Sequence, residues 1–412
     1  MVWEQKSPTP QSRRDVSTNA KMTNEQRKYF GLDPIENHWD KVVLKGDKYR
    51  PESILYFEKD TIKRHIVSTE NQYIEKHYNE LTKNRAILLP KTSKGKEKKL
   101  TPSVLEQRQP TGIYLNVSFG YLTIGNYNSQ TTFYSSIWHN EEPSNKSISE
   151  ILNDFIISSP QNHFTEIEQF KGLKRKNIKF KSGDYFSFKI DRINYGFGRI
   201  LLDIGKIKKK KLINEKHGLN FIMSLPVLIE LFAFTSNSKN IDIVSLDKKP
   251  KLPSDIMMDN LFLYGEYEII GHREINDNEF DFPISYRVSF DQSRKVFLQW
   301  GLIHQEIPKE SYNKYIYTNE MQIGQNPYSY NRIGFRPAYN GIDILKTVQN
   351  EGVYDFDQST HHKAKWDLRN PRNKEIKDEL FKTFGLDSTK NYYENSKLTQ
   401  TILPSEMNKQ LK

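Results

Sequence analysis

The chain has 412 residues, a formal net charge of +11 and no cysteine. At about 150 residues per domain this length indicates two domains, and the 12% aromatic content favours sheets over a helical bundle. The lack of cysteine excludes disulfides, thiolate zinc sites and cysteine nucleophiles. No stretch holds about 18 consecutive apolar residues, so we expect no membrane-spanning helix.

The N-terminal third predicts a polar leader followed by a small α+β domain. Residues 1–21 are rich in Ser, Thr, Arg and Pro and lack an apolar run of roughly 7–15 residues, so we expect a disordered leader rather than a secretory signal. Residues 22–165 form the predicted N-terminal domain, which we cannot assign to a family. Its strands are expected over 41–44, 53–57, 61–67 and three runs within 112–138.

Two capping-box spacings predict helices in this domain. Thr69 stands three residues before Gln72, which indicates a helix over 68–84. Ser147 stands three residues before Glu150 and precedes an apolar stripe, which indicates a second helix over 144–158.

The remainder predicts a basic connector, a β-rich domain and a tail. Residues 166–182 form the connector, residues 183–387 a mostly antiparallel, barrel-like β domain with short C-terminal helices, and residues 388–412 a loose polar tail. Strands are expected within 185–204, 220–234, 261–271, 286–290, 296–301 and 331–335, and short helices at 341–351 and 373–384. The KIKKKKL sequence at 206–212 is expected to be a charged loop or hairpin tip. The predicted fold class is α+β.

Positive charge is concentrated at the start of the second domain. Residues 171–216 hold fifteen Lys or Arg against four acids, and this excess of eleven equals that of the whole chain. Concentrated charge indicates an acidic partner. Three interpretations stay open: a solvated lysine-rich face, a nucleic-acid site in which aromatic rings stack on bases, and a protein partner with an acidic surface.

The sequence predicts no catalytic, cofactor-binding or metal-binding residue. HxH, HExxH and GxSxG motifs are absent. His272 and His304 each follow an expected strand and could meet carboxylates, although a packing role is favoured. The adjacent His361 and His362 would point to opposite faces of an extended chain. Glu266 and Glu268 share a strand face, as the residues of any solvent-facing strand do.

The glycine pair in Tyr195-Gly196-Phe197-Gly198-Arg199 lies inside an expected strand and lacks phosphate-loop spacing. Such glycines indicate a strong bend or a close backbone approach. The alternative is a ligand contact made by Tyr195 and Arg199.

Four blocks of the second domain resemble the immunity protein 26 family of bacterial polymorphic toxin systems. They are GDYFSFKID with YGFGRIL at 183–201, PVLIELFAF at 226–234, LPSDIMMDNLFLYGEYEIIG at 252–271 and VFLQWG at 296–301. NRIGF at 331–335 and WDLRNP with the following helix at 366–386 are also similar to the family's C-terminal part. The order and spacing of the blocks together carry the resemblance, which spans about 180–387.

The resemblance implies a cytoplasmic, non-catalytic immunity protein that binds and neutralises a cognate protein toxin, without a cofactor. Because some members of the group are named with a phosphotriesterase, a phosphotriester hydrolase is one alternative, and a nucleic-acid-binding module on the basic patch is another. We expect the partner surface beside the first hairpin of the domain. The candidate contact residues are Tyr195, Arg199, Lys208, Lys209, Lys210, Lys211 and Trp300.

Overall fold

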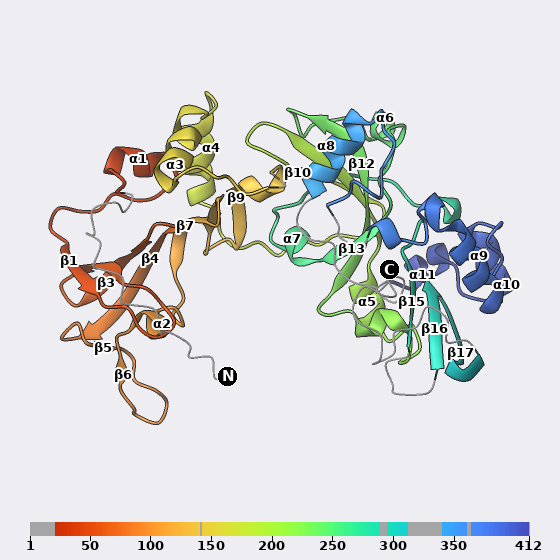
Figure 1. Ribbon diagram of the computed structural model, residues 1–412, viewed down its shortest axis with the longest axis horizontal. Helices are drawn as coiled ribbons and strands as arrows, with labels where there is room; N and C mark the ends of the chain where they lie inside the picture. Colours follow the sequence, from red (N-terminus) through yellow and green to blue (C-terminus); the bar gives the residue numbers. More distant parts are fainter. Residues whose placement is uncertain (1–20, 141, 289–294, 312–339, 361–363, 412) are drawn as a thin grey trace, which may run out of the picture. The chain divides into compact units, whose positions relative to one another are not determined.

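The computed structural model describes residues 21–140, 142–288, 295–311, 340–360 and 364–411 (Figure 1). The chain forms two compact units. Unit 1 takes the described residues up to Asn128 together with Pro143–Leu173, and unit 2 takes Ser129–Glu142 together with the described residues from Lys174 onward. The predicted leader therefore lies almost wholly outside the described residues, as do the expected strand at 331–335 and the pair His361 and His362.

Unit 1 is built on an antiparallel sheet in which neighbours in sequence are mostly neighbours in space. Its strands follow in the order β1 (Asp40–Leu44), β2 (Ser53–Glu58), β3 (Thr61–Ser68), β4 (Gln72–Lys83), β7 (Thr111–Ser118) and β8 (Tyr121–Asn126). The short strand β5 (Ile87–Leu88) pairs with the end of β4, and the short strand β6 (Lys98–Lys99) pairs with β5.

Period-two burial gives this sheet two different faces. In β2, Leu55 and Phe57 are buried in an apolar cluster that includes Leu105 of α2 (Pro102–Leu105), while Ile54 and Tyr56 point to the other face. The helices α1 (Asn24–Tyr29), α3 (Ile148–Ile157) and α4 (His163–Lys171) gather in one part of unit 1 (Figure 1). Phe30, after α1, stacks on Phe155 of α3 at 5.1 Å.

One of the two capping-box predictions is confirmed and the other is wrong. Ser147 caps α3 as predicted, with both bonds of the box formed. Residues 68–84, however, contain the long strand β4, which pairs with β3 over most of its length and with β7 over its first half. Thr69 and Gln72 form the turn into β4 instead, since the Thr69 N–H donates to the Gln72 carbonyl at 2.9 Å. Sheet pairing on both sides has overridden the local helical spacing.

Unit 2 contains two open antiparallel sheets, and the predicted α+β, mainly antiparallel class is confirmed. In the described residues neither sheet closes into a barrel. The larger sheet has the order β13 (Asp255–Met258), β12 (Pro226–Ser236), β11 (Tyr195–Leu202), β10 (Asp184–Lys189), β14 (Glu268–His272). The smaller has the order β15 (Ile284–Val288), β16 (Lys295–Trp300), β17 (Ile303–Pro308).

The glycine pair of β11 allows the close approach that its sequence context predicted. A Cβ on Gly198 would lie 2.3 Å from Cζ of Phe186 and 2.7 Å from the Glu230 carbonyl oxygen. A Cβ on Gly196 would lie 2.9 Å from Cζ of Phe188. The two glycines therefore let aromatic rings of β10 lie flat across β11.

Helices cover both sheets of unit 2. Ile344 of α8 (Asn340–Gln349) is buried against the larger sheet, and α9 (Lys374–Thr383) places Phe381 5.3 Å from the Trp300 ring. The expectation of a loose tail is wrong, because the tail forms α10 (Tyr392–Leu398) and α11 (Pro404–Leu411). Tyr392 and Met407 are buried in the main apolar cluster of the unit.

Two further local predictions need correction. Residues 206–212 were expected to be a loop but lie largely in the helix α5 (Ile204–Lys209). The expected strand at 261–271 is divided between α7 (Asn260–Leu263) and β14.

Candidate functional site

The helix α5 forms because its N-terminus is capped and two side chains anchor it. The Asp203 carboxylate accepts from the Lys206 backbone N–H at 2.8 Å. Ile204 and Ile207 are buried in the main apolar cluster of unit 2. The lysines of α5 are thereby turned away from this core, and those in its last turn interact favourably with the negative end of the helix dipole.

Lys208 fastens a loop to this helix. Its Nζ donates to the carbonyl oxygen of Ile222 and, at 3.3 Å, to that of Ser224. Partial burial lowers the pKa of Lys208. The loop that joins η3 (Gly218–Phe221) to β12 is therefore held directly beside α5.

The end of η3 and this loop each expose one large apolar side chain. Phe221 is 44% exposed and Met223 is 70% exposed, whereas Leu219 and Ile222 between and beside them are buried. The buried side chains of Leu219 and Ile222 anchor the backbone here, so Phe221 and Met223 are held in place on the surface. Exposed apolar groups of this size on a rigid loop are typical of a contact site for another molecule.

Three exposed lysines follow directly after Lys208, which holds this loop. Lys209, Lys210 and Lys211 are exposed, and none of them is in an ion pair with a described residue. Lys210 donates instead to the Gln410 carbonyl at 2.9 Å. We call Phe221, Met223 and these three lysines the α5–η3 surface.

The predicted contact residues do not form one patch. Lys208, Lys209, Lys210 and Lys211 lie together at α5, but Tyr195 begins β11 while α5 follows the end of that strand, roughly 23 Å away. Arg199 is fully buried, and Trp300 is buried against Phe381 and Tyr392. Burial removes Arg199 and Trp300 from any contact surface in this conformation.

Arg199 instead links β11 to the segment that follows β14 inside unit 2. Its Nη1 donates to Glu279 at 2.9 Å, and its Nη2 donates to the carbonyl oxygens of Arg273 and Glu274 at 3.0 Å. Its guanidinium lies 4.9 Å from the Tyr185 ring centroid. A buried guanidinium requires a carboxylate and several hydrogen-bond acceptors, and Arg199 has them. The role of Arg199 is therefore structural.

Each histidine considered for catalysis lies near a carboxylate, and His272 has a second one, since its Nε2 lies 3.6 Å from Glu274. His272 Nδ1 lies 2.8 Å from Asp184, and His304 Nε2 lies 3.6 Å from Glu306. Within the described ranges no three His, Asp or Glu side chains gather as a metal site would need. Glu266 and Glu268 do not act as a pair, because each has a different partner. Glu266 accepts a hydrogen bond from the Thr132 backbone N–H, and Glu268 forms an ion pair with Lys239.

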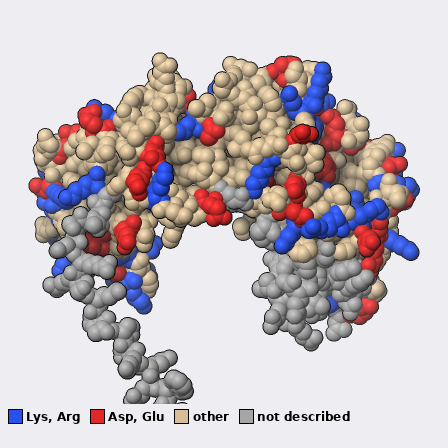
Figure 2. Space-filling model, turned by 45° about the horizontal axis from the view of Figure 1, so that its top comes forward, with Lys and Arg blue, Asp and Glu red and all other residues tan. Residues whose placement is uncertain are grey.

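The sequence reasoning missed Phe221 and Met223, because residues 220–234 were predicted to be one buried strand. Pro226, which begins β12, was the available signal that the residues before it lie outside the strand. Figure 2 shows that acidic and basic side chains are interspersed on the face drawn there, so no continuous basic area covers that face.

Residues 181–296 match the family model described as Immunity protein 26, which confirms the resemblance over that segment. The matched segment includes the whole α5–η3 surface. No curated protein and no solved structure matches the chain. Among the helices of the described residues, none has the length and apolar character needed to cross a bilayer.

Proposed function

We propose, from the match of residues 181–296 to the immunity protein 26 family, that this protein binds a cognate bacterial toxin and neutralises it without catalysis. The toxin would belong to a polymorphic toxin system and be bound in the cytoplasm of the producing cell. The observation that carries the proposal is the α5–η3 surface, which lies inside the matched segment and combines exposed apolar side chains with lysines that pair with no acid in the part of the chain that the structure describes.

This arrangement fits the anatomy of a protein interface. Contact sites have an apolar centre that carries most of the binding energy and a polar rim that excludes water. Met223 and Phe221 supply the centre, and Lys209, Lys210 and Lys211 supply one side of the rim. The partner is expected to carry an apolar pocket bordered by acidic side chains, which the lysines would also steer towards the surface.

The test is co-expression with the toxin encoded beside this gene, followed by a pull-down and a growth assay. Met223→Ser is expected to weaken toxin binding at least roughly tenfold, as truncation of a central contact does. Lys209→Glu is expected to slow association and to make it less dependent on salt. The matched controls are Val244→Ser and Lys248→Glu at α6 (Ile243–Asp247), which the ribbon places at the other end of β12 (Figure 1).

The outcomes separate the function from the surface. If the intact chain neither binds the toxin nor rescues growth, the proposed function is lost. If it does both but the α5–η3 variants behave like the α6 controls, the function stands and the contact lies elsewhere. Binding to duplex DNA that Lys209→Glu weakens, with a steep log–log salt slope, would favour a nucleic-acid-binding module instead.

A further inference from the structure

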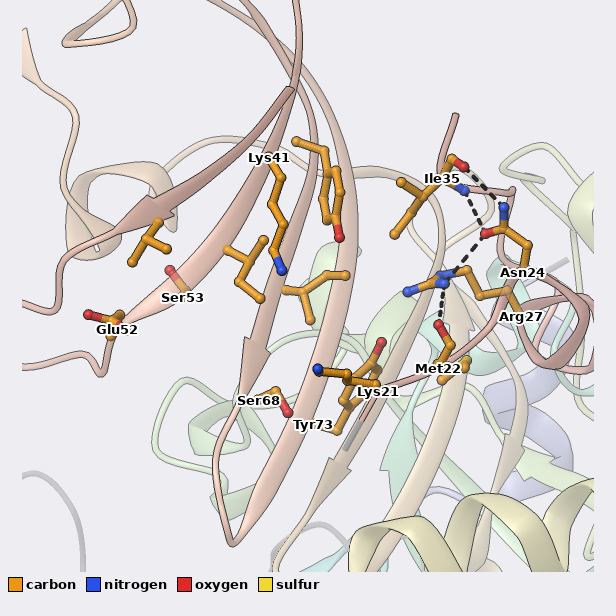
Figure 3. A pocket seen from close by; sticks show the side chains of 14 residues that line it. Lys21, Met22, Asn24, Arg27, Ile35, Lys41, Glu52, Ser53, Ser68 and Tyr73 are labelled. Carbon is orange, nitrogen blue, oxygen red and sulfur yellow. Dashed lines mark hydrogen bonds between the residues drawn. The ribbon is translucent and has the colours of Figure 1, made fainter. Parts of the chain in front are cut away.

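Unit 1 contains a cavity of about 610 Å³ on the face of its sheet opposite the Leu55 and Phe57 core. This volume lies in the range of small-molecule sites. It is formed by the first three strands, by Tyr73 of β4 and by the segment that leads into and includes α1 (Figure 3). All of its lining residues belong to unit 1.

The sheet register gives the cavity an apolar floor. Val43 is directly opposite Ile54, and Ile54 is directly opposite Ile66, so three strands contribute one apolar row. In the neighbouring row Lys41 is opposite Tyr56. The cavity therefore offers an apolar surface next to a cation and a phenol.

A buried ion cluster lies at the back of the cavity. The Glu75 carboxylate accepts from Arg27 Nε at 3.0 Å and from the Tyr73 hydroxyl at 2.6 Å, and Arg64 Nε lies 3.5 Å from the same carboxylate. Arg27 Nη1 donates to the Met22 carbonyl at 2.6 Å. One carboxylate thus faces two guanidinium groups, which leaves a positive charge uncompensated at a buried position.

Three hydrogen-bond donors around the cavity have no partner among the described residues. They are the Nζ atoms of Lys21 and Lys41 and the Tyr56 hydroxyl. Figure 3 shows Lys41 reaching in from the sheet and Arg27 from the opposite wall, with Lys21 beside Tyr73.

The charges around the cavity do not balance. Lys21, Arg27 and Lys41 line it against the single acid Glu52, and the Arg64 and Glu75 charges behind them cancel. The net charge is therefore +2. A phosphate monoester carries about −1.5 to −2 at neutral pH and accepts several hydrogen bonds at once.

We infer that this cavity binds a small phosphate monoester whose apolar or aromatic body rests on Val43, Ile54 and Ile66. The phosphate is held by Lys21, Lys41 and Arg27, with the Tyr56 hydroxyl as a further donor. The cavity is much larger than a phosphate ion, and its floor is apolar, so the organic body contributes to binding.

The experiment is calorimetric titration of the intact chain with phenyl phosphate, inorganic phosphate and benzoate. Phenyl phosphate is expected to bind most tightly, because it alone has both the dianion and the aromatic body. Its affinity should fall as the pH drops through about 6, where the second phosphate proton binds. Benzoate has no such titration above about pH 5 and serves as the carboxylate comparison.

Two conservative variants and one control test the assigned donors. Lys41→Gln removes a cation from an exposed position on β1, and Tyr56→Phe removes the hydroxyl but keeps the ring. Losing a charged donor should weaken phenyl phosphate binding roughly tenfold or more. Lys45→Gln changes an exposed lysine just beyond β1 that does not line the cavity, and it should bind as the unchanged chain does.

Three results would overturn the inference. These are no saturable binding of phenyl phosphate or inorganic phosphate, equal affinity for benzoate and phenyl phosphate, and equal effects of Lys41→Gln and Lys45→Gln. None of them bears on toxin binding by unit 2, so this inference and the proposed function fail independently.

Discussion

The ion cluster around Glu75 permits a sharp prediction about stability. Glu75→Gln keeps the shape of the side chain but removes the only negative charge between Arg27 and Arg64 in the described cluster. The Glu75 side chain is fully buried, and those of Arg27 and Arg64 are 6% and 1% exposed. Both guanidinium groups therefore remain almost fully buried with no carboxylate between them.

The expected loss follows from this burial. Breaking a buried ion pair by removing one partner costs about 3–5 kcal/mol, because the remaining charge stays desolvated. The matched control is Glu25→Gln, which breaks the Glu25–Lys28 pair of α1 at 2.8 Å. There the side chains are 80% and 59% exposed, and such a pair is worth about 0.5 kcal/mol or less.

Hydrogen exchange followed by mass spectrometry is the appropriate assay, because the two units need not unfold together. Peptides from β3 and β4 report the free energy of opening unit 1 alone. We expect protection in these peptides to fall strongly in Glu75→Gln and to change little in Glu25→Gln. Equal losses in the two variants would refute the reasoning that burial makes the Glu75 charge indispensable.

Two further predictions concern unit 2. Gly198→Ala puts a Cβ 2.3 Å from Phe186 Cζ, so we expect unit 2 to lose about 1–3 kcal/mol in urea unfolding. The control is Gly172→Ala in unit 1, where a Cβ would have no contact closer than 3.6 Å and unit 1 should lose little stability. Similar losses in the two units would contradict the packing argument. Burial lowers the pKa of His217 from 6.5 to about 4, so its contribution to stability is present above pH 6.5 and is lost as the pH falls through about 4. His217→Asn should therefore flatten the pH dependence of exchange in β16 peptides between about pH 7 and about pH 4.5, and an unchanged slope would contradict this.

Local patterns, such as the alternation of apolar and polar residues along a strand, could be predicted from the sequence. Which strands pair with one another could not. Ser147 and its apolar stripe specify α3 locally, and the structure has that helix. Thr69 and Gln72 have the same spacing, but the residues after them are paired with β3 and β7, strands that local spacing cannot anticipate. The tail was misjudged for a similar reason, since Tyr392 and Met407 belong to a largely polar segment but pack in a core built from distant parts of the chain.

The candidate site was predicted in part, since the sequence identified the lysines of α5 but not the apolar pair beside them. Phe221 and Met223 belong to an apolar run in which Leu219 and Ile222 are buried, and only the folded loop decides which members of that run face outwards. Arg199 shows the converse. Arg199 adds to the positive charge counted in the sequence. In the structure its guanidinium is buried and hydrogen-bonded to Glu279 and to two backbone carbonyl groups, so it is not available to a partner.

Fewer basic residues are available to a partner than the sequence contains, and this bears on the kind of partner. Of the fifteen basic residues in 171–216, Lys206 pairs with Asp203, Lys208 is bonded to carbonyl groups and Arg199 is buried. At α5 the cations that pair with no described acid are the three lysines that follow Lys208 in the chain. Duplex DNA requires a line of cations that follows its phosphates, and an apolar centre adds nothing to such contacts. A short run of lysines on the helix next to a loop with exposed apolar side chains is better matched by a protein surface, which favours a protein over duplex DNA as the partner.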